Sequence, residues 1–501
     1  MALGGLTSFI LTLHVLVISN HSIFVVMLFN SLKFFLIFPL IFGIYWGIPV
    51  RWNQVRKVFL ILVSYLLYMN FKPAFALVLL AVTLVTYWGG QILEFRDQSE
   101  EIIVRRKRLV WLFALMGVLP LLVFKYYNFL NNSVSEGLAA IGLQFSIPGL
   151  NWAVPVGISF FTFQAVGYML DVYHKRIKAE KNLIDYLLFV SFFPQIASGP
   201  ISKADELLPQ IKKERTFNYN QAVSGLKYLL WGMFLKVVLA DRAGIYVDTV
   251  FASYEKFSGA GCALASVLYS IQIYSDFAGY SLMAVGIAKT LGFDLINNFK
   301  RPYFATSVSE FWKRWHISLT RWLTQQIYIP LGGSRCSKIR TYWNILATFL
   351  VSGIWHGANW TFLVWGGIHG VFQIIEKALG WNKKESKGLI KALRIVFTFS
   401  IVTIAWVIFR SPSICEAIGL MSRYFTNAGR LIPDGALEHL VYCWLAIIPV
   451  LVYEVLSEFQ PKLFRLIIRK RVLCWIAYLI LFTSIVLIGV HDGSSFIYVS
   501  F

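Results

Sequence analysis

Charged residues are scarce in this 501-residue chain: 14% of the residues are Asp, Glu, Lys or Arg, whereas 57% are hydrophobic. This balance excludes an ordinary water-soluble protein, in which roughly 25% of the residues are charged. Cysteine is also rare. The five cysteines are scattered along the chain, and no two of them stand in a CxxC pair. The sequence therefore predicts neither a disulfide framework nor a metal site.

Several catalytic and energy-coupling motifs are absent as well. The chain contains no GxxxxGK[ST] phosphate-binding loop, no HExxH zinc motif and no GxSxG nucleophile motif. Their absence disfavours an ATP-driven pump, and nothing in the sequence predicts a permanently bound cofactor.

Long apolar runs, in contrast, recur along almost the whole chain. A run of about 20 apolar residues is long enough for a helix to cross a bilayer. Such runs lie at 32–49, 58–93, 109–130, 154–173, 184–200, 222–240, 260–292, 342–378, 394–409, 437–457 and 472–490. Some are short or interrupted by Gly and Pro, which is typical of re-entrant or tilted segments. The sequence predicts an all-α polytopic membrane protein with about 11–13 membrane-embedded segments.

The net charge of +21 could indicate a nucleic-acid partner, but its distribution argues otherwise. Basic residues cluster in short loops beside the apolar runs, at 51–57, 105–108, 175–181, 212–215, 383–394 and 469–471. The positive-inside rule places such loops in the cytoplasm. The charge-poor connections 131–152 and 411–436 then face outward. We predict a multi-pass protein of the cytoplasmic membrane. Its partner is the lipid bilayer, and we expect no nucleic-acid partner.

The N-terminal segment 2–26 is apolar but lacks the basic residues that begin a signal peptide. It is either an extra first helix or an extension upstream of a start at Met27. We predict residues 1–26 as this extension or extra helix, and residues 27–501 as one transmembrane domain.

His356 is the most conspicuous polar residue of the apolar runs. It lies in VSGIWHGANW, residues 351–360, within the apolar stretch 342–375. An ionisable group at membrane depth is costly and is by default a functional candidate. The small neighbours Gly353, Gly357 and Ala358 would let a backbone or a substrate come close. For His369, in the same stretch, we expect a packed, singly hydrogen-bonded role.

Residues 309–323, SEFWKRWHISLTRWL, form a second candidate element. At helical spacing one face carries Trp312, Trp315, His316, Leu319, Trp322 and Leu323. Another face carries basic residues. Such a helix is typical of a membrane interface, and amphipathicity alone favours an anchor with the Trp residues at headgroup depth. The alternative makes His316 a second active-site group, with Lys313, Arg314 and Arg321 near the phosphates of an anionic donor.

Asp276 is a carboxylate within the apolar run 260–292. A buried carboxylate needs a donor, such as Tyr280 one helical turn away, or it orients a histidine. We favour the structural hydrogen bond. Lys236, with the pair Asp241 and Arg242, is interpreted as an interfacial anchor or a local ion pair.

The two histidine motifs together resemble a known family. FWKRWHISL at 311–319 followed by WHG at 355–357 is similar to the membrane-bound O-acyltransferases, and within them to the alginate O-acetyltransferase membrane subunits. Further similar stretches are 154–164, 171–173, 198–201, 208–210, 236–242, the Asp276 segment, 328–333 and 496–501. The resemblance covers 27–501, and MLFNS at 27–31 favours Met27 as the start. Two departures are TQQI at 324–327, where many relatives carry Arg-Asp-Tyr, and Leu282, where an acidic residue is common.

This resemblance implies a helical bundle with re-entrant and interfacial helices around a central tunnel. It implies His356 as the base of an acyl transfer and His316 as a group that orients the donor or stabilises the oxyanion. The residues expected to support or shape the pocket are Asp276, Trp312, Trp315, Trp355, Asn359 and Trp360. The implied co-substrate is acetyl-CoA on the cytoplasmic side. The implied acceptor is an exported polysaccharide such as alginate, reached through a periplasmic or extracellular SGNH-type acetyltransferase.

Other functions remain open at this point. Some relatives transfer D-alanine to teichoic acid, although they are typically shorter at the C-terminus. A polysaccharide or acyl-group transporter, with the histidines as a proton relay, belongs to another class, and a structural scaffold is a third possibility. The lack of an internal repeat weakens the transporter hypothesis.

Overall fold

A computed structural model describes residues 29–94, 100–143, 148–381, 386–490 and 497. Regular structure in these residues is helical, and their β pairing is limited to one isolated bridge between Phe257 and Arg430. The prediction of an all-α protein is confirmed. The predicted N-terminal extension, residues 1–26, lies outside the described residues.

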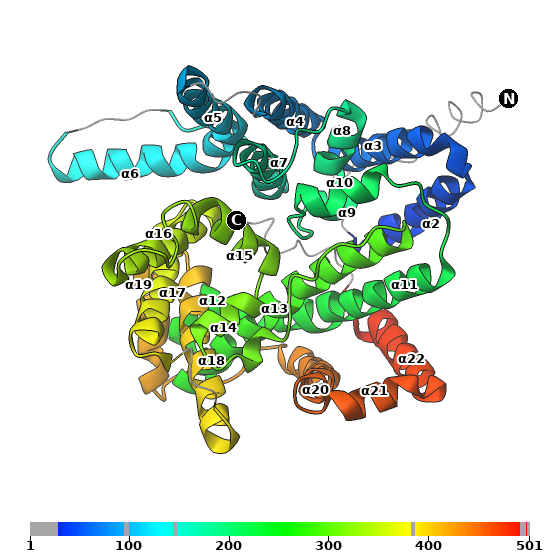
Figure 1. Ribbon diagram of the computed structural model, residues 1–501. Helices are drawn as coiled ribbons and strands as arrows, with labels where there is room; N and C mark the ends of the chain where they lie inside the picture. Colours follow the sequence, from blue (N-terminus) through cyan, green and yellow to red (C-terminus); the bar gives the residue numbers. More distant parts are fainter. Residues whose placement is uncertain (1–28, 95–99, 144–147, 382–385, 491–496, 498–501) are drawn as a thin grey trace.

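The helices pack together as a bundle (Figure 1). They are α2 (Leu32–Gly47), α3 (Asn53–Met69), α4 (Pro73–Leu93), α5 (Glu100–Leu121), α6 (Tyr127–Ala140), α7 (Ile158–Tyr173), α8 (Leu183–Ser191), α9 (Phe193–Ile196), α10 (Ala204–Lys212), α11 (Tyr219–Met233), α12 (Asp241–Ala252), α13 (Gly259–Thr290), α14 (Val308–Arg314), α15 (Ile317–Leu323), α16 (Lys338–His356), α17 (Trp360–Ala378), α18 (Gly388–Arg410), α19 (Ile414–Ser422), α20 (Leu437–Phe459), α21 (Pro461–Arg469) and α22 (Arg471–Ile488). π-Helical segments continue three of them: η2 (Leu122–Tyr126), η3 (Phe234–Ala240) and η6 (Thr324–Tyr328).

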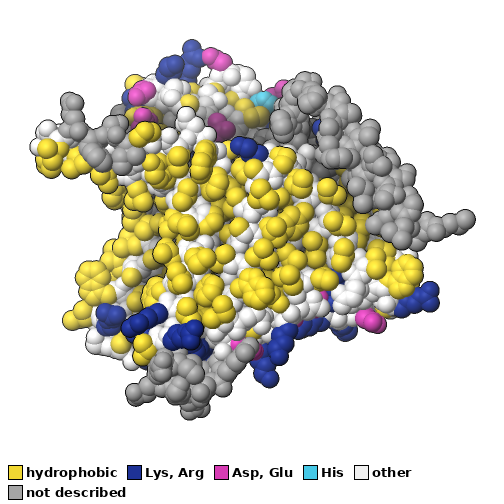
Figure 2. Space-filling model, turned by 90° about the horizontal axis from the view of Figure 1, so that it is seen from above, with side chains coloured by type: hydrophobic (Ala, Val, Ile, Leu, Met, Phe, Trp, Pro, Cys, Tyr) yellow, Lys and Arg dark blue, Asp and Glu magenta, His cyan; other side chains and the backbone are white. Residues whose placement is uncertain are grey.

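Six helices of the described residues are long and apolar enough to cross a membrane, or seven if a pair bent by 106° between α2 and α3 counts as one span. They are Pro73–Leu93, Ile103–Ala140, Tyr219–Ala252, Gly388–Arg410, Leu437–Phe459 and Arg471–Ile488. Figure 2 shows their setting: hydrophobic side chains form a broad band, and Lys and Arg gather mainly along its edges. The chain is thus a multi-pass membrane protein. The estimate of 11–13 segments also counts shorter embedded helices, and it stays a prediction.

The long helix α13 runs beside α11 through the middle of the bundle (Figure 1). Two glycine pairs bring their backbones into contact. A Cβ atom on Gly279 would lie 2.7 Å from the Gly232 carbonyl oxygen, and one on Gly286 would lie 2.6 Å from the Gly225 carbonyl oxygen. Since the pairing reverses direction, the two helices are antiparallel. Small residues at this contact allow the close packing that membrane helices use in place of a hydrophobic driving force.

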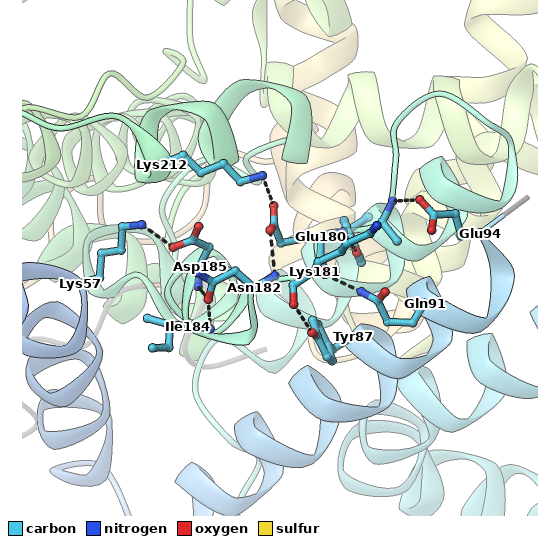
Figure 3. A network of polar contacts seen from close by, with 12 residues as sticks. Lys57, Tyr87, Gln91, Glu94, Glu180, Lys181, Asn182, Ile184, Asp185 and Lys212 are labelled. Atoms are coloured by element: carbon cyan, nitrogen blue, oxygen red, sulfur yellow. Dashed lines mark hydrogen bonds and ion pairs between the residues drawn. The ribbon is translucent and has the colours of Figure 1, made fainter. Parts of the chain in front are cut away.

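Basic segments that are distant in the sequence meet in one network of polar contacts (Figure 3). Lys57 pairs with Asp185 at 2.6 Å, and Lys212 pairs with Glu180 at 2.6 Å. The Tyr87 hydroxyl donates to the Lys181 carbonyl at 2.7 Å. The loops 51–57, 175–181 and 212–215 therefore share one membrane face, as the positive-inside rule requires of cytoplasmic loops.

Candidate active site

His316 interrupts a helix that the sequence pattern predicts to be continuous. Helix α14 ends at Arg314, and α15 begins at Ile317. Between them Trp315 is extended, and His316 is left-handed with φ 43° and ψ 54°. The prediction of one amphipathic helix over 309–323 is wrong at this point. A non-glycine residue in this region costs roughly 1–3 kcal/mol, and such strain is typical of functional sites.

Long-range hydrogen bonds hold this break. The Asn298 carbonyl accepts from the Ile317 N–H at 2.9 Å, and the Asn298 side-chain oxygen accepts from the Ser318 N–H at 3.1 Å. At the start of α14, the Glu376 carboxylate of α17 accepts the N–H groups of Val308 and Ser309 at 2.5 and 2.9 Å. Because a carboxylate complements the positive end of a helix, Glu376 fixes α14 against α17.

The imidazole of His316 is fully buried among aromatic rings. Its centroid lies 4.6 Å from Phe277, 5.8 Å from Trp355 and 6.2 Å from Phe160. Within the described residues neither ring nitrogen has a hydrogen-bond partner. Burial lowers the pKa of His316, which lies outside the membrane-spanning segments, to about 3. The ring is therefore neutral at physiological pH, so one nitrogen can donate and the other can accept.

His356 is the last residue of α16 and is 2% exposed. Its ring lies 4.9 Å from Trp355 and 4.9 Å from Trp365, with Phe409 at 5.5 Å. Trp355 thus contacts both His356 and His316. The two histidines predicted from the sequence come from separate elements, and the structure brings both imidazoles into contact with the Trp355 indole.

Glycines explain how α16 and α17 come together around His356. A Cβ atom on Gly353 would lie 2.3 Å from the Phe362 carbonyl oxygen, and one on Gly366 would lie 2.4 Å from the Phe349 carbonyl oxygen. A Cβ atom on Gly357 would lie 1.9 Å from the Phe362 ring. The sequence-based expectation that small neighbours let a backbone come close to His356 is confirmed.

Lys125 is a site residue that the sequence reasoning missed. It lies in the π-helical segment η2, within the long helix Ile103–Ala140. Its ammonium donates to the Trp355 carbonyl at 2.9 Å and to the His356 carbonyl at 2.8 Å. The next residue, Tyr126, donates to the Ile354 carbonyl at 2.6 Å. A lone lysine within the apolar run 109–130 was the available signal, because a cation there needs a partner.

Two pockets lie at opposite ends of α7. The first has about 420 Å³ of empty space and is lined by residues 154–160 together with Lys125, Trp355 and His356. The second has about 320 Å³ and includes Asp171, Lys203 and Ser318 in its lining. In the second pocket Asp171 accepts from Arg176 of the basic loop at 2.8 Å and from Gln326 at 2.8 Å. The second pocket therefore lies toward the face with the basic loops.

An aromatic layer separates the two pockets. Phe163 stacks on Trp322 at 3.9 Å and lies 5.5 Å from Trp355, and Phe160 lies 5.4 Å from Trp355. His316 is part of the same layer through its contact with Phe160. The predicted tunnel corresponds here to a pocket on each side of this layer, with the histidines beside it.

Trp312 and Trp315 are buried in the protein, 4% and 0% exposed, so they do not lie at the headgroups as the anchor interpretation expects. Trp312 contacts the His369 ring at 5.2 Å, and Trp315 contacts Trp406 at 5.1 Å. His369 is packed as expected. The single hydrogen bond expected for it is absent from the described residues.

Asn359 and Trp360 are placed away from the histidines. The Asn359 side chain accepts from the Thr361 N–H at 3.0 Å and donates to the Pro412 carbonyl at 2.8 Å. It caps the start of α17, as Asn commonly does. Trp360 is 54% exposed and contacts Phe129 at 5.6 Å. Neither residue is in the lining of the pocket beside His356, and the expectation that they shape the pocket stays a prediction.

Asp276 pairs with Lys236 at 2.6 Å, and both side chains are 1% exposed. It also accepts the Ile497 N–H at 2.8 Å, and Lys236 pairs with Asp241 at 2.7 Å. The favoured structural role of Asp276 agrees with this geometry, but the donors are Lys236 and the C-terminal segment, not Tyr280. The interpretation of Lys236 and Asp241 as a local ion pair is confirmed.

The three cations predicted near a donor phosphate differ in availability. Arg314 pairs with Glu310 at 2.5 Å and with Glu458 at 3.0 Å, and Arg321 pairs with Glu206 at 2.5 Å. Although burial acts to raise it, the pKa of Glu310 is lowered because Thr306 and Arg314 donate to its carboxylate. Lys313 is exposed and forms no ion pair within the described residues. The part of the chain that the structure describes also contains no cluster of His, Cys, Asp and Glu that could hold a metal ion.

Comparison with known proteins identifies the family of this chain. The model of the membrane-bound O-acyltransferase family matches residues 174–409, which include both histidines. A Pseudomonas aeruginosa protein named probable alginate O-acetylase AlgI is 36% identical over 80% of this chain and 75% of its own length. A Helicobacter pylori peptidoglycan O-acetyltransferase is 36% identical over 54% of this chain and 57% of its own. A Streptococcus thermophilus teichoic acid D-alanyltransferase is 28% identical over 64% of this chain and 79% of its own. With these relatives and this helical membrane fold, the chain belongs to the membrane-bound O-acyltransferase family and is an O-acyltransferase.

Proposed function

We propose that this enzyme moves an acetyl group from acetyl-CoA on the cytoplasmic side of the cytoplasmic membrane toward an exported polysaccharide such as alginate. The names of the Pseudomonas aeruginosa and Helicobacter pylori relatives, both O-acetylating proteins, support acetate as the transferred group. In this proposal a periplasmic or extracellular SGNH-type acetyltransferase receives the group and carries it to the polymer.

The observation that carries the proposal is the position of the two histidines at an aromatic layer between two pockets. His356 lines the first pocket, and Ser318, two residues after His316, lines the second. A thioester that enters from the basic face and a hydroxyl that enters from the other face would meet at this layer. Lys203 in the second pocket is a cation suited to the phosphates of a coenzyme A donor.

The proposed reaction is a direct acyl transfer. The acceptor hydroxyl oxygen adds to the thioester carbonyl carbon while the neutral imidazole of His356 takes the hydroxyl proton. His316, which is neutral and buried, donates a hydrogen bond to the oxyanion of the tetrahedral intermediate. The carbon–sulfur bond then breaks, and the proton held by His356 passes to the leaving thiolate. The products are an ester and free coenzyme A, with no change in redox state.

The test compares His356→Ala and His316→Ala with wild type in inverted membrane vesicles supplied with labelled acetyl-CoA and acceptor. Because the base is lost, His356→Ala should lower ester formation by about 10²–10⁴-fold. His174→Ala, a histidine in the basic loop after α7, is the matched control and should stay near wild type. Protein level in the membrane is measured by immunoblot. Wild-type ester formation in His356→Ala, at equal protein level, would overturn the proposal.

The second candidate is D-alanyl transfer, because a teichoic acid D-alanyltransferase is among the relatives. Mild alkali releases the ester-linked acid from the cell envelope of an expressing strain, and mass spectrometry identifies it. Acetate supports the first proposal, and D-alanine supports the second. Transport of substrate without any released acid, from vesicles that contain the protein, would favour a transporter over both.

A further inference from the structure

A large cavity lies away from the histidines, between α11, α13, α20, α21 and α22. Water-sized spheres can occupy about 1030 Å³ of it. Pockets for small molecules typically measure roughly 300–1,000 Å³, so the cavity has room for a ligand at the upper end of that range. Its wall is mainly apolar, with side chains such as Leu235, Val450 and Leu481. We call it the C-terminal groove.

The C-terminal groove opens within the membrane-spanning part of the bundle. Its outer wall consists of α20 and α22, both of which are long and apolar enough to cross a membrane. Figure 1 shows α20, α21 and α22 in succession along one edge of the bundle, with α22 beside α11. These three helices follow residue 409, where the match to the family model ends. The groove is therefore built partly from elements outside the matched region.

One end of the groove carries positive charge that no carboxylate neutralises. Lys227 and Lys300 line it, and both are exposed without a carboxylate partner within the described residues. The Lys227 ammonium lies 5.5 Å from the centroid of the Tyr478 ring, which also lines the groove. The lining acid Glu454 is 6% exposed and accepts a hydrogen bond from Tyr274. Arg301 is already paired with Glu458 at 2.7 Å. The two lysines thus remain available to an anion.

Helix α21 marks this end as a membrane interface. Phe464 and Ile467 point into the groove, whereas Lys462, Arg465 and Arg469 are exposed. A short helix with an apolar inner face and a basic outer face lies in the headgroup region. The positive-inside rule assigns this end to the cytoplasmic leaflet.

The deep wall of the groove also presents a polar donor. Asn298 lines it and is 1% exposed. The Asn298 amide nitrogen has no hydrogen-bond partner within the described residues. Its oxygen accepts from the Ser318 N–H. A ligand with ester carbonyl oxygens below its headgroup would satisfy this donor.

We propose that the C-terminal groove binds one anionic phospholipid of the cytoplasmic leaflet. Its phosphate lies beside Lys227 and Lys300, and its acyl chains extend between α11, α20 and α22. Three features of the groove match such a lipid. The apolar wall within the membrane suits the acyl chains, the cationic end at the interface suits the phosphate, and the buried donor between them suits the ester carbonyl oxygens. The proposal does not depend on which group the enzyme transfers.

The test uses purified full-length protein in detergent, incubated with equal amounts of phosphatidylglycerol and phosphatidylcholine that carry the same acyl chains. Native mass spectrometry then counts the lipids that remain bound. We expect one retained phosphatidylglycerol, preferred over phosphatidylcholine by about tenfold, since each lysine near an anionic headgroup favours binding. Equal retention of the two lipids would overturn the proposal.

Variants separate the groove from the general surface. Lys227→Gln with Lys300→Gln should remove the preference for phosphatidylglycerol. Lys338→Gln with Arg340→Gln, two exposed cations at the start of α16, removes the same net charge and should keep the preference. Ala477→Trp fills the groove without changing charge and should abolish retention of both lipids. A wild-type lipid count in Ala477→Trp, or an unchanged preference in the Lys227 and Lys300 variant, would contradict a bound lipid at this site.

Discussion

At the scale of single residues, the candidate site depends on groups that hold the histidines as well as on the histidines themselves. His356 ends a helix, so its own carbonyl and those before it lack partners within α16. Lys125 and Tyr126 supply these partners from a different helix. The π-helical turn that contains them is a geometry found frequently at functional sites. Lys125 is in this respect a positioning residue for His356.

Substitution of Lys125 by Met should lower the turnover rate by about 10²-fold, because a misplaced catalytic group costs that much even when binding is intact. The Michaelis constant for the acyl donor, acetyl-CoA in our proposal, should change little. Lys125→Arg keeps the charge and donors, so it should restore part of the rate. The measurement is initial-rate kinetics in membrane vesicles. A rise in the Michaelis constant with an unchanged turnover rate would instead indicate that Lys125 binds substrate.

At the scale of elements, the site requires two contacts between helices. One is the glycine-mediated contact of α16 with α17, which sets the position of His356. The other is the attachment of α14 to α17 through Glu376, which sets the position of the break at His316. Since α17 takes part in both, it is the common support of the two histidines.

Gly353→Ala should destabilise the protein by about 1–3 kcal/mol, the usual cost of an added methyl group that a packed contact cannot accept. The matched control is Gly367→Ala on the same helix pair, where the nearest atom to a new Cβ is Leu350 Cδ2 at 4.0 Å. Its effect should stay within about 0.5 kcal/mol. Thermal unfolding of the purified proteins in detergent compares the two. Equal stability of both variants would show that the backbones can separate without cost.

At the scale of the whole molecule, the distribution of basic residues determines the orientation of the bundle in the bilayer. The ion pairs of Lys57 and Lys212 gather three basic loops on one face. The connection 411–436 between α18 and α20 then lies on the opposite face, and it includes Cys415, which is free and exposed.

A membrane-impermeant maleimide added to intact spheroplasts should therefore label Cys415. Cys415→Ser is the control and should lose this labelling, because Cys262 and Cys443 are buried. The half-buried Cys336 and Cys474 stand beside basic residues, on the side that the reagent does not reach. Labelling that appears only after the membrane is permeabilised would reverse the orientation and place the basic loops outside. Mass spectrometry of the labelled peptide provides the readout.

The sequence by itself determined the membrane class, the clustering of basic residues in loops and the two histidines. Hydrophobicity and charge act locally along the chain, so these features can be recognised from the sequence without knowledge of the fold. The family resemblance added the roles of His356 and His316, and these roles stay predictions for the tests above.

Only the tertiary structure decided the immediate surroundings of the histidines. The break at His316 depends on Asn298 and Glu376, and the end of α16 depends on Lys125, all of them distant in sequence. Trp360 is close to His356 in sequence but is exposed, whereas Trp312 and Trp315 are buried, not interfacial. Helical periodicity assumes a continuous helix, and long-range hydrogen bonds overrode it because a buried helix end must find its partners wherever the fold provides them.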